Sequence, residues 1–172
     1  MPSNPQYRVP SPELNTDRLI LRLITAEDIA AVMEDRRQPS WAPDFPSPGD
    51  REIAGLLSRI GVPAGAGAHF GHRLVLERES ELVIGGVGFF GPPENGRVEI
   101  GYGIVESWRC RGYATEAVVA MLQFALTQPR VTEVIATTDP GNTASLRVLE
   151  KSGLSYQSRD DSEVVYLINS PH

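Results

Sequence analysis

The stretch VEIGYGIVESWRCRGYATEAVVAMLQFAL, residues 98–126, joins an alternating segment to a helical one. Residues 97–105 alternate in polarity, which predicts a strand. From residue 113 the apolar residues recur at helical spacing, which predicts a helix over 113–128 that ends before Pro129. The connection between the two carries Arg109, Arg111 and Gly112, so two cations and a conformationally free residue lie at the start of the helix.

The start of this helix has the chemistry of an anion-binding site. The first turn of a helix leaves backbone N–H groups unpaired at the positive end of its dipole, and one phosphate group satisfies several of them. Gly112 permits a tight turn, Ala114 keeps the first turn small, and Thr115 adds a hydroxyl group. These features suit a pyrophosphate, although a plain strand-to-helix connection with two solvated arginines explains the same residues. The loop matches neither the G-x-x-x-x-G-K-[ST] phosphate loop nor the G-x-G-x-x-G dinucleotide fingerprint.

The composition restricts the classes of protein to consider. The 172 residues suit one domain, which we place at residues 13–172 after a polar lead-in at 1–12. The 22 acidic and 16 basic residues give a net charge of −6, which argues against a nucleic-acid-binding protein. The single cysteine excludes an intramolecular disulfide. We find neither an apolar run of roughly 18 residues nor a secretory leader, so we expect no membrane association and a cytoplasmic location.

The remaining pattern predicts an α+β fold of mixed α/β order. Alternation indicates further strands at residues 18–24, 73–78, 82–91, 132–138, 154–159 and 163–168. Helical periodicity indicates further helices at 25–36, 51–60 and 143–154. Four prolines exclude regular structure from 38–50, and small residues predict a flexible loop at 61–68. An antiparallel meander followed by helix, strand, helix and hairpin is not the alternating Rossmann order.

Three motifs resemble those of the GNAT superfamily, the Gcn5-related N-acetyltransferases. RCRGYA at 109–114 is similar to the family signature [QR]-x-x-G-x-[GA], and NTASLRVLEKSGL at 142–154 is similar to a second cofactor-side segment. TDRLILRLITAEDIAAV at 16–32 is similar to the opening of the RimJ/RimL-like ribosomal-protein N-acetyltransferase branch. The resemblance covers roughly residues 14–168. It implies the GNAT fold: a central, mostly antiparallel twisted sheet, splayed in the middle between strands 97–105 and 132–138, with helices on both faces.

The resemblance also implies a cofactor and the residues that bind it. Acetyl-CoA is the co-substrate; the backbone of the signature loop binds its pyrophosphate, and its pantetheine arm lies in the splay as a pseudo-strand. An N-cap role by itself also explains Asn142. The residues implied in cofactor binding are Ile104 and Val105 on the strand edge, Arg109, Cys110, Arg111, Gly112, Tyr113, Ala114 and Thr115 at the loop and helix start, and Asn142.

Two residues are candidates for the acyl transfer itself. The acceptor nitrogen must lose a proton, and Glu99 is our candidate base, with a solvent-facing or salt-bridged strand carboxylate as the alternative. We expect a backbone N–H near Ile104 to stabilise the tetrahedral oxyanion. Many relatives place a tyrosine seven positions after the equivalent of Asn142 as proton donor to the leaving thiolate. This chain has Leu149 there, which leaves Ser145 as the local candidate, unless that serine only caps its own backbone.

The expected function is therefore acetyl transfer from acetyl-CoA to a primary amine, either a small molecule or a protein N-terminus, by direct attack. Two alternatives are a GNAT-fold module that binds acyl-CoA without turnover and an unrelated phosphate-binding domain. We expect no metal, because His69 and His72 of the H-x-x-H pair have no evident third ligand. Trp41 and Phe45 either line an acceptor pocket or pack in the core. The identity of the acceptor and the presence of a homodimer are left open.

Overall fold

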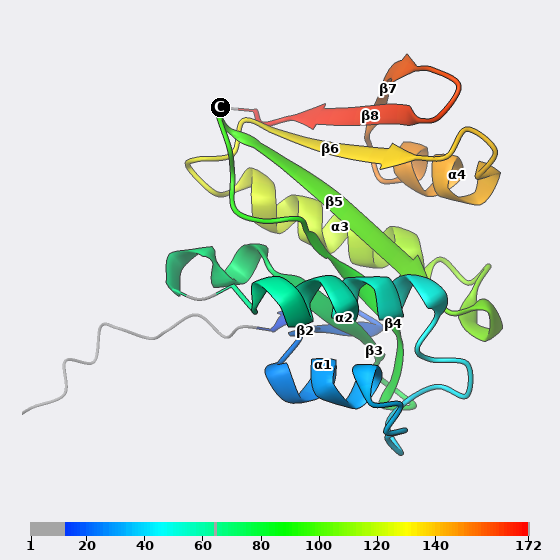
Figure 1. The fold of residues 1–172 in the computed structure, drawn as a ribbon. Helices are drawn as coiled ribbons and strands as arrows, with labels where there is room; N and C mark the ends of the chain where they lie inside the picture. Colours follow the sequence, from blue (N-terminus) through cyan, green and yellow to red (C-terminus); the bar gives the residue numbers. More distant parts are fainter. Residues whose placement is uncertain (1–12, 64, 172) are drawn as a thin grey trace, which may run out of the picture.

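The computed structural model describes residues 13–63 and 65–171 and contains an eight-stranded sheet with helices on both faces (Figure 1). The predicted lead-in at 1–12 lies outside the described residues. The strands are β1 (Leu14–Asn15), β2 (Leu19–Leu23), β3 (His72–Glu77), β4 (Leu82–Phe89), β5 (Arg97–Ile104), β6 (Glu133–Thr138), β7 (Ser155–Arg159) and β8 (Val164–Asn169). The helices are α1 (Ala26–Met33), α2 (Pro48–Ile60), α3 (Tyr113–Leu126) and α4 (Thr143–Lys151), with short 3-10 helices η1 (Gly65–Phe70) and η2 (Glu106–Trp108). This order confirms the predicted α+β fold.

The sheet divides between β5 and β6. Its strand order is β1-β2-β3-β4-β5-β6-β8-β7, and every pairing is antiparallel except that of β5 with β6. The parallel pair joins only Arg97–Glu99 to Glu133–Ile135. Beyond Glu99, β5 continues along β4 as far as the pair Ile104–Gly85, whereas β6 continues along β8. The two strands therefore diverge, which confirms the predicted splay (Figure 1).

Helix α3 supplies the core on one face of the sheet. Its buried residues form the apolar face that the sequence predicts, and they contact β2, β4, β5 and β6. Burial of a side chain such as Met121, which is 0% exposed, contributes about 2 kcal/mol of stabilisation. Helices α1 and α2 pack together on the opposite face of the sheet (Figure 1). None of the helices within the described ranges is both long and apolar enough to cross a membrane.

Helix α2 begins earlier than the sequence analysis predicts. Residues 38–50 were expected to be irregular, but the helix starts at Pro48. Ser47 is the N-cap: its side chain accepts a hydrogen bond from the Asp50 N–H, and the Asp50 carboxylate accepts one from the Ser47 N–H at 2.8 Å. Proline at the first helical position costs nothing in hydrogen bonding, because that N–H has no partner within the helix. The four prolines led to the prediction of irregular structure, although Ser47 and Asp50 form a capping box there.

Two smaller expectations are also corrected, and one open alternative is decided. Helix α1 ends at Met33 rather than near residue 36, and Asp35 adopts a left-handed conformation with φ of 56°. Part of the loop predicted at 61–68 belongs to η1. Trp41 and Phe45 are buried, with ring centroids 5.3 Å apart in an edge-to-face arrangement. These two aromatic residues therefore pack in the core rather than line a pocket.

Candidate active site

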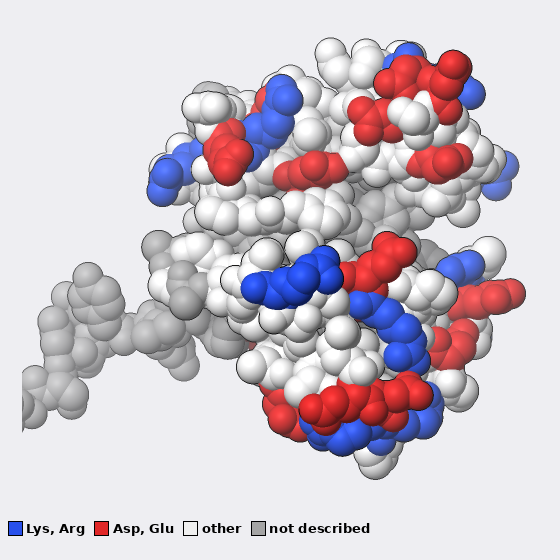
Figure 2. Space-filling view, in the orientation of Figure 1, with Lys and Arg blue, Asp and Glu red and all other residues white. Residues whose placement is uncertain are grey.

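A cleft of about 450 Å³ lies between α2 and the splayed part of the sheet. Helix α2 forms one wall, and the end of β6 with the start of α4 forms another. Figure 2 shows the groove, with carboxylates on both sides of it and a basic patch on the α2 side. The floor consists of four glycines in adjacent strands, namely Gly86 and Gly88 of β4 and Gly101 and Gly103 of β5.

The glycines make room for different groups. A Cβ atom on Gly86 would collide with the His72 imidazole, and one on Gly101 would lie 2.8 Å from the ring of Phe90. A Cβ atom on Gly103 would meet nothing within 4 Å. The floor is therefore packed at one end by the protein's own side chains and open beside Gly103. Glycine in a strand interior is typical of sites where another chain or a ligand approaches the backbone.

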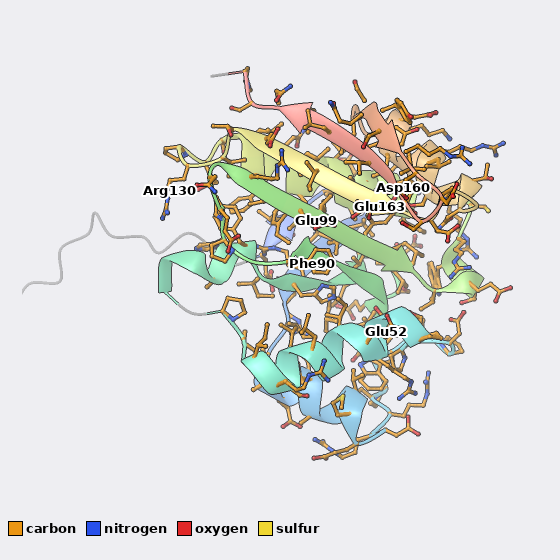
Figure 3. The ribbon with its side chains drawn as sticks, turned by 45° about the horizontal axis from the view of Figure 1, so that its top comes forward. Glu52, Phe90, Glu99, Arg130, Asp160 and Glu163 are labelled. Atoms are coloured by element: carbon orange, nitrogen blue, oxygen red, sulfur yellow. The ribbon has the colours of Figure 1, made fainter. Side chains whose placement is uncertain are left out.

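Glu99 lies at the point where β5 and β6 separate. Its carboxylate accepts a hydrogen bond from the hydroxyl group of Thr137 on β6. The side chain is half-buried and lines the cleft together with Gly101 and Gly103, as the predicted alternation requires. Figure 3 shows Glu99 on β5, with Phe90 close to it and Glu52 on α2. The arrangement leaves a carboxylate at the closed end of the splay.

The backbone of β5 presents alternate residues to the splay. The N–H of Phe90 donates to the carbonyl of Glu99, and the N–H of Val105 donates to the carbonyl of Ile84, so these β5 residues face β4. By alternation, the backbone groups of Ile100, Tyr102 and Ile104 lie on the β6 side of the strand. The last pairing of β5 with β6, at Glu99 and Ile135, uses the Ile100 N–H, so the first N–H that faces the opening is that of Tyr102. The expectation that Val105 offers a free edge group is therefore wrong for its N–H, because β4 already pairs it. The Ile104 carbonyl also has a partner, Arg109 Nε at 2.8 Å.

The loop before α3 makes the tight turn at Gly112 that the sequence predicts. Gly112 is the N-cap in a left-handed conformation, with φ of 81°, and no side chain caps the first turn. The N–H groups of Tyr113, Ala114 and Thr115 therefore lie at the helix start without a side-chain acceptor. Cys110 is exposed and also adopts positive φ, at 63°. The turn thus brings a row of donors to the surface at the open end of the splay.

Arg109 and Arg111 give the loop positive charge and also stabilise its conformation through hydrogen bonds to backbone carbonyls. Arg111 Nη2 donates to the carbonyl of Ser107 at 3.2 Å, and its guanidinium lies 4.8 Å from the centre of the Trp108 ring. Arg109 Nε donates its hydrogen bond to the Ile104 carbonyl. Both residues remain exposed. Their positive charge is therefore fixed next to the helix start.

Arg18, in the turn before β2, holds this loop in place through three contacts. Its Nη1 donates to the Arg111 carbonyl at 3.0 Å, and its Nη2 lies 2.7 Å from the Glu116 carboxylate. The guanidinium also lies 4.2 Å from the centre of the Tyr113 ring. Thr16 donates a further hydrogen bond to Glu116 at 2.6 Å. Sequence reasoning missed Arg18, because no local pattern links it to a loop more than 90 residues away.

The start of α4 brings Asn142 and Ser145 to the cleft. The Asn142 side chain accepts a hydrogen bond from the Ser145 N–H at 3.1 Å, so its N-cap role is realised. Ser145 Oγ lies 2.6 Å from the hydroxyl oxygen of Tyr102, which reaches across from β5. Burial raises the pKa of Tyr102 despite this hydrogen bond, so the phenol stays protonated. Leu149 is fully buried, which places its side chain in the core.

Two partly buried titratable groups meet where α2 packs on the sheet: His72 of β3 and Asp50 in the first turn of α2. Burial lowers the pKa of His72 to about 4, so its imidazole is neutral at physiological pH. Burial also raises the pKa of Asp50, whose carboxylate hydrogen-bonds with Ser47. His69 lies apart from His72, with its ring 6.2 Å from that of Phe124 on α3. Residues 13–63 and 65–171 contain no group of three or more His, Cys, Asp or Glu side chains that could hold a metal ion.

Known proteins share this sequence pattern and this fold. The model of the acetyltransferase (GNAT) domain family matches residues 18–155. The uncharacterized N-acetyltransferase YjdG of Bacillus subtilis is 32% identical over 97 residues, which are 55% of this chain and 58% of YjdG. The chain spans about half the length of the first curated relatives that it matches.

Two solved structures show the same architecture. A GNAT-family acetyltransferase from Bacillus anthracis superposes with a TM-score of 0.66 at 21% identity, over 93% of this chain and 99% of the other. RimL, a ribosomal L7/L12 α-N-protein acetyltransferase in complex with coenzyme A, superposes with a TM-score of 0.61 at 16% identity, over 91% of this chain and 97% of the other. At these identities the likeness concerns the fold.

Proposed function

Because the chain belongs to the GNAT acetyltransferase family, we propose that it transfers the acetyl group of acetyl-CoA to a primary amine by direct attack. The observation that carries this proposal is the order of three features along the chain, which we take together as the path of the cofactor: the cleft at Glu99, the edge of β5 that β6 leaves unpaired beyond Glu99, and the uncapped start of α3. The coenzyme A in the RimL complex supports the same cofactor, and the likeness to RimL supports the RimJ/RimL-like branch.

The cofactor occupies the open side of this path. The N–H groups at the start of α3 bind the pyrophosphate, assisted by the charge of Arg109 and Arg111 and by the Thr115 hydroxyl. The pantetheine arm lies along β5, where the N–H of Ile104 faces the splay. Asn142 and Ser145 border the same space from α4. The thioester then lies near the closed end of the splay.

Glu99 accepts the proton that the amine must lose. A lysine-type amine with a pKa of about 10.4 is mostly protonated at neutral pH, so a nearby carboxylate both attracts the ammonium and assists its deprotonation, directly or through water. The nitrogen then attacks the thioester carbonyl. The Ile104 N–H lies about 16 Å along the strand from Glu99, so the oxyanion is better served by the N–H of Tyr102, which faces the same opening nearer to Glu99.

The leaving thiolate receives its proton from the hydroxyl pair of Ser145 and Tyr102. Ser145 is the residue expected from sequence, and Tyr102 is the partner that the geometry adds, 2.6 Å away. A proton that leaves Ser145 Oγ is replaced from the Tyr102 phenol, and the phenol regains a proton from water in the cleft, so that water is the net proton source. The thiol group of coenzyme A has a pKa near that of cysteine, so this step requires only modest assistance. The pair therefore compensates for the leucine at position 149.

Calorimetric titration with acetyl-CoA, followed by thiol release in the presence of a panel of amines, tests the proposal. We expect micromolar binding of acetyl-CoA and amine-dependent thiol release. Glu99→Gln is expected to lower kcat at least tenfold with little change in acetyl-CoA affinity, whereas the exposed control Glu79→Gln changes neither. Acetyl-CoA binding without thiol release for any amine would favour the non-catalytic acyl-CoA-binding module. No binding would contradict the cofactor assignment.

A further inference from the structure

The α2 wall of the cleft is apolar and exposed. Ile53, Leu56 and Ile60 lie on one side of α2 at helical spacing, and Pro63 follows them. The Ile60 residue is 68% exposed. Phe90 also lines the cleft and is 58% exposed. Large apolar side chains left exposed around a concave site are typical of ligand contact.

The charged groups around this wall are acidic. Glu52 of α2 and Glu99 of β5 line the cleft (Figure 3), and no lysine or arginine does so within the described residues. The basic patch on the α2 side of Figure 2 therefore lies outside the lining. Arg97, which lines a neighbouring hollow beside Phe90, is already paired with Glu133. An anionic group in the cleft would meet carboxylates without a counter-ion.

His72 adds a hydrogen-bonding group without adding charge. Its imidazole lines the cleft against Gly86, and no hydrogen bond from it to a described residue is present. Because the ring is neutral, its free nitrogen accepts a hydrogen bond from a cationic donor without electrostatic repulsion. Asp50 of α2 approaches the same glycine, with Oδ1 3.3 Å from the position of a Gly86 Cβ atom. The polar side chains of the cleft therefore offer hydrogen-bond acceptors to a cationic amine and no positive charge to an anion.

We infer that the acceptor is a primary ammonium carried on an apolar body, such as an aryl or branched alkyl group, with no carboxylate or phosphate close to the amine. This inference rests on the proposed acetyl transfer, because it names the second substrate of that reaction. Glu99 and Glu52 attract the ammonium, and Phe90 adds an exposed aromatic ring to the lining of the same cleft. Ile53, Leu56 and Ile60 cover the apolar body. An amino acid with a free carboxylate fits the same volume but places its anion among carboxylates.

The test compares three amines that differ in one feature. 2-Phenylethylamine, phenylalaninamide and phenylalanine share the aromatic body and the primary amine. Phenylalaninamide also resembles the first residue of a peptide, so its comparison with 2-phenylethylamine distinguishes a free amine from a protein N-terminus. Putrescine serves as an amine without an apolar body. We measure kcat/KM by thiol release and, independently of turnover, the affinity of each amine for the protein saturated with coenzyme A.

We expect 2-phenylethylamine and phenylalaninamide to exceed phenylalanine and putrescine at least tenfold in both measurements. Glu52→Gln is expected to raise KM for 2-phenylethylamine severalfold at unchanged kcat, whereas Asp161→Asn, at an exposed residue outside the cleft, leaves KM unchanged. Equal or better use of phenylalanine or putrescine overturns the inference even if acetyl transfer is confirmed. Absence of thiol release for every amine contradicts the proposed function. The order of the binding affinities then still tests whether the cleft prefers an ammonium on an apolar body.

Discussion

Replacement of Gly112 by glutamate is expected to abolish tight binding of acetyl-CoA while the fold persists. Gly112 has φ of 81°, a conformation that costs other residues roughly 1–2 kcal/mol. A Cβ atom there lies 3.4 Å from Arg18 Nη2, which is an ordinary van der Waals distance, so steric strain is small. The substitution therefore affects the ligand site much more than the core.

The expected charge effect is large, because the new carboxylate lies at the site proposed for the pyrophosphate. Two like charges about 5 Å apart repel by about 3 kcal/mol at an effective dielectric constant of about 20, and physiological salt reduces this roughly by half. A pyrophosphate with about two negative charges therefore loses about 3 kcal/mol of binding free energy. This loss corresponds to an increase in Kd of roughly 150-fold. The carboxylate also competes with the phosphate for the N–H groups at the start of α3.

Two matched variants separate charge from backbone strain. Gly112→Gln has the shape of the glutamate variant without its charge, and Gly112→Ala has only the backbone strain. Calorimetry with acetyl-CoA is expected to rank the affinities as wild type, then Ala and Gln with losses of at most tenfold, then Glu. Thermal unfolding should show similar, small destabilisation in all three. Equal affinity in the Glu and Gln variants would refute the electrostatic reasoning, and unchanged affinity in all three would refute the anion site.

Three further predictions concern the residues around this path. Tyr102→Phe is expected to lower kcat, measured by steady-state thiol release, about tenfold at unchanged KM. Because the two hydroxyl groups act as one unit, the double variant with Ser145→Ala should be no slower than the slower single variant, and additive losses would contradict the relay. Arg18→Met should weaken acetyl-CoA binding about tenfold by calorimetry and lower Tm by a few degrees, whereas Glu116→Gln should weaken it less, because Arg18 still donates to the Arg111 carbonyl. His72→Gln should make the free energy of unfolding less dependent on pH. Because the pKa of His72 falls from 6.5 to about 4 on folding, the neutral imidazole contributes its full stabilisation above pH 6.5, and this stabilisation is lost as the pH falls through 4. Urea unfolding at pH 7 and pH 4.5 should differ by about 2 kcal/mol more in the wild type than in the variant; Asp50, whose pKa burial raises, acts in the opposite direction in both proteins.

The loop could be predicted from the residues themselves because its determinants are local, whereas the splay was expected only from the resemblance to the GNAT superfamily. Gly112 lies directly between a period-two segment and a period-3.6 segment, so the strand, the turn and the helix start follow from neighbouring residues. Arg18 and Tyr102 depend instead on contacts across the fold. The Arg18 hydrogen bond to Arg111 spans 93 residues, and the contact between Tyr102 and Ser145 spans 43. Alternation placed Tyr102 on the face of Val98 and Ile100 but did not show how far its ring reaches.

The dependence on contacts across the fold also explains why Val105 was wrongly expected to offer a free backbone N–H. Sequence alternation shows which residues of a strand share a face, but it does not show which neighbouring strand takes their backbone groups. The pairing of Val105 with Ile84 depends on the length of β4, which continues beside β5 after β6 has diverged. The start of α2 was missed for a different reason: proline disfavours helix interiors and favours the first helical turn, and composition alone does not distinguish these positions.

An acidic chain that binds an anionic cofactor requires its charges to be separated in space. Arg18, Arg109 and Arg111 gather at the start of α3, at the open end of the splay, and Glu99 lies at its closed end. In the proposed reaction, the pyrophosphate and the ammonium are thus attracted to opposite ends of one path, and their reacting groups meet between them. Acetylation converts the ammonium into a neutral amide, which Glu52 and Glu99 no longer attract. The carboxylates that draw the acceptor into the cleft therefore favour release of the product, because the charge they recognise is removed by the reaction itself.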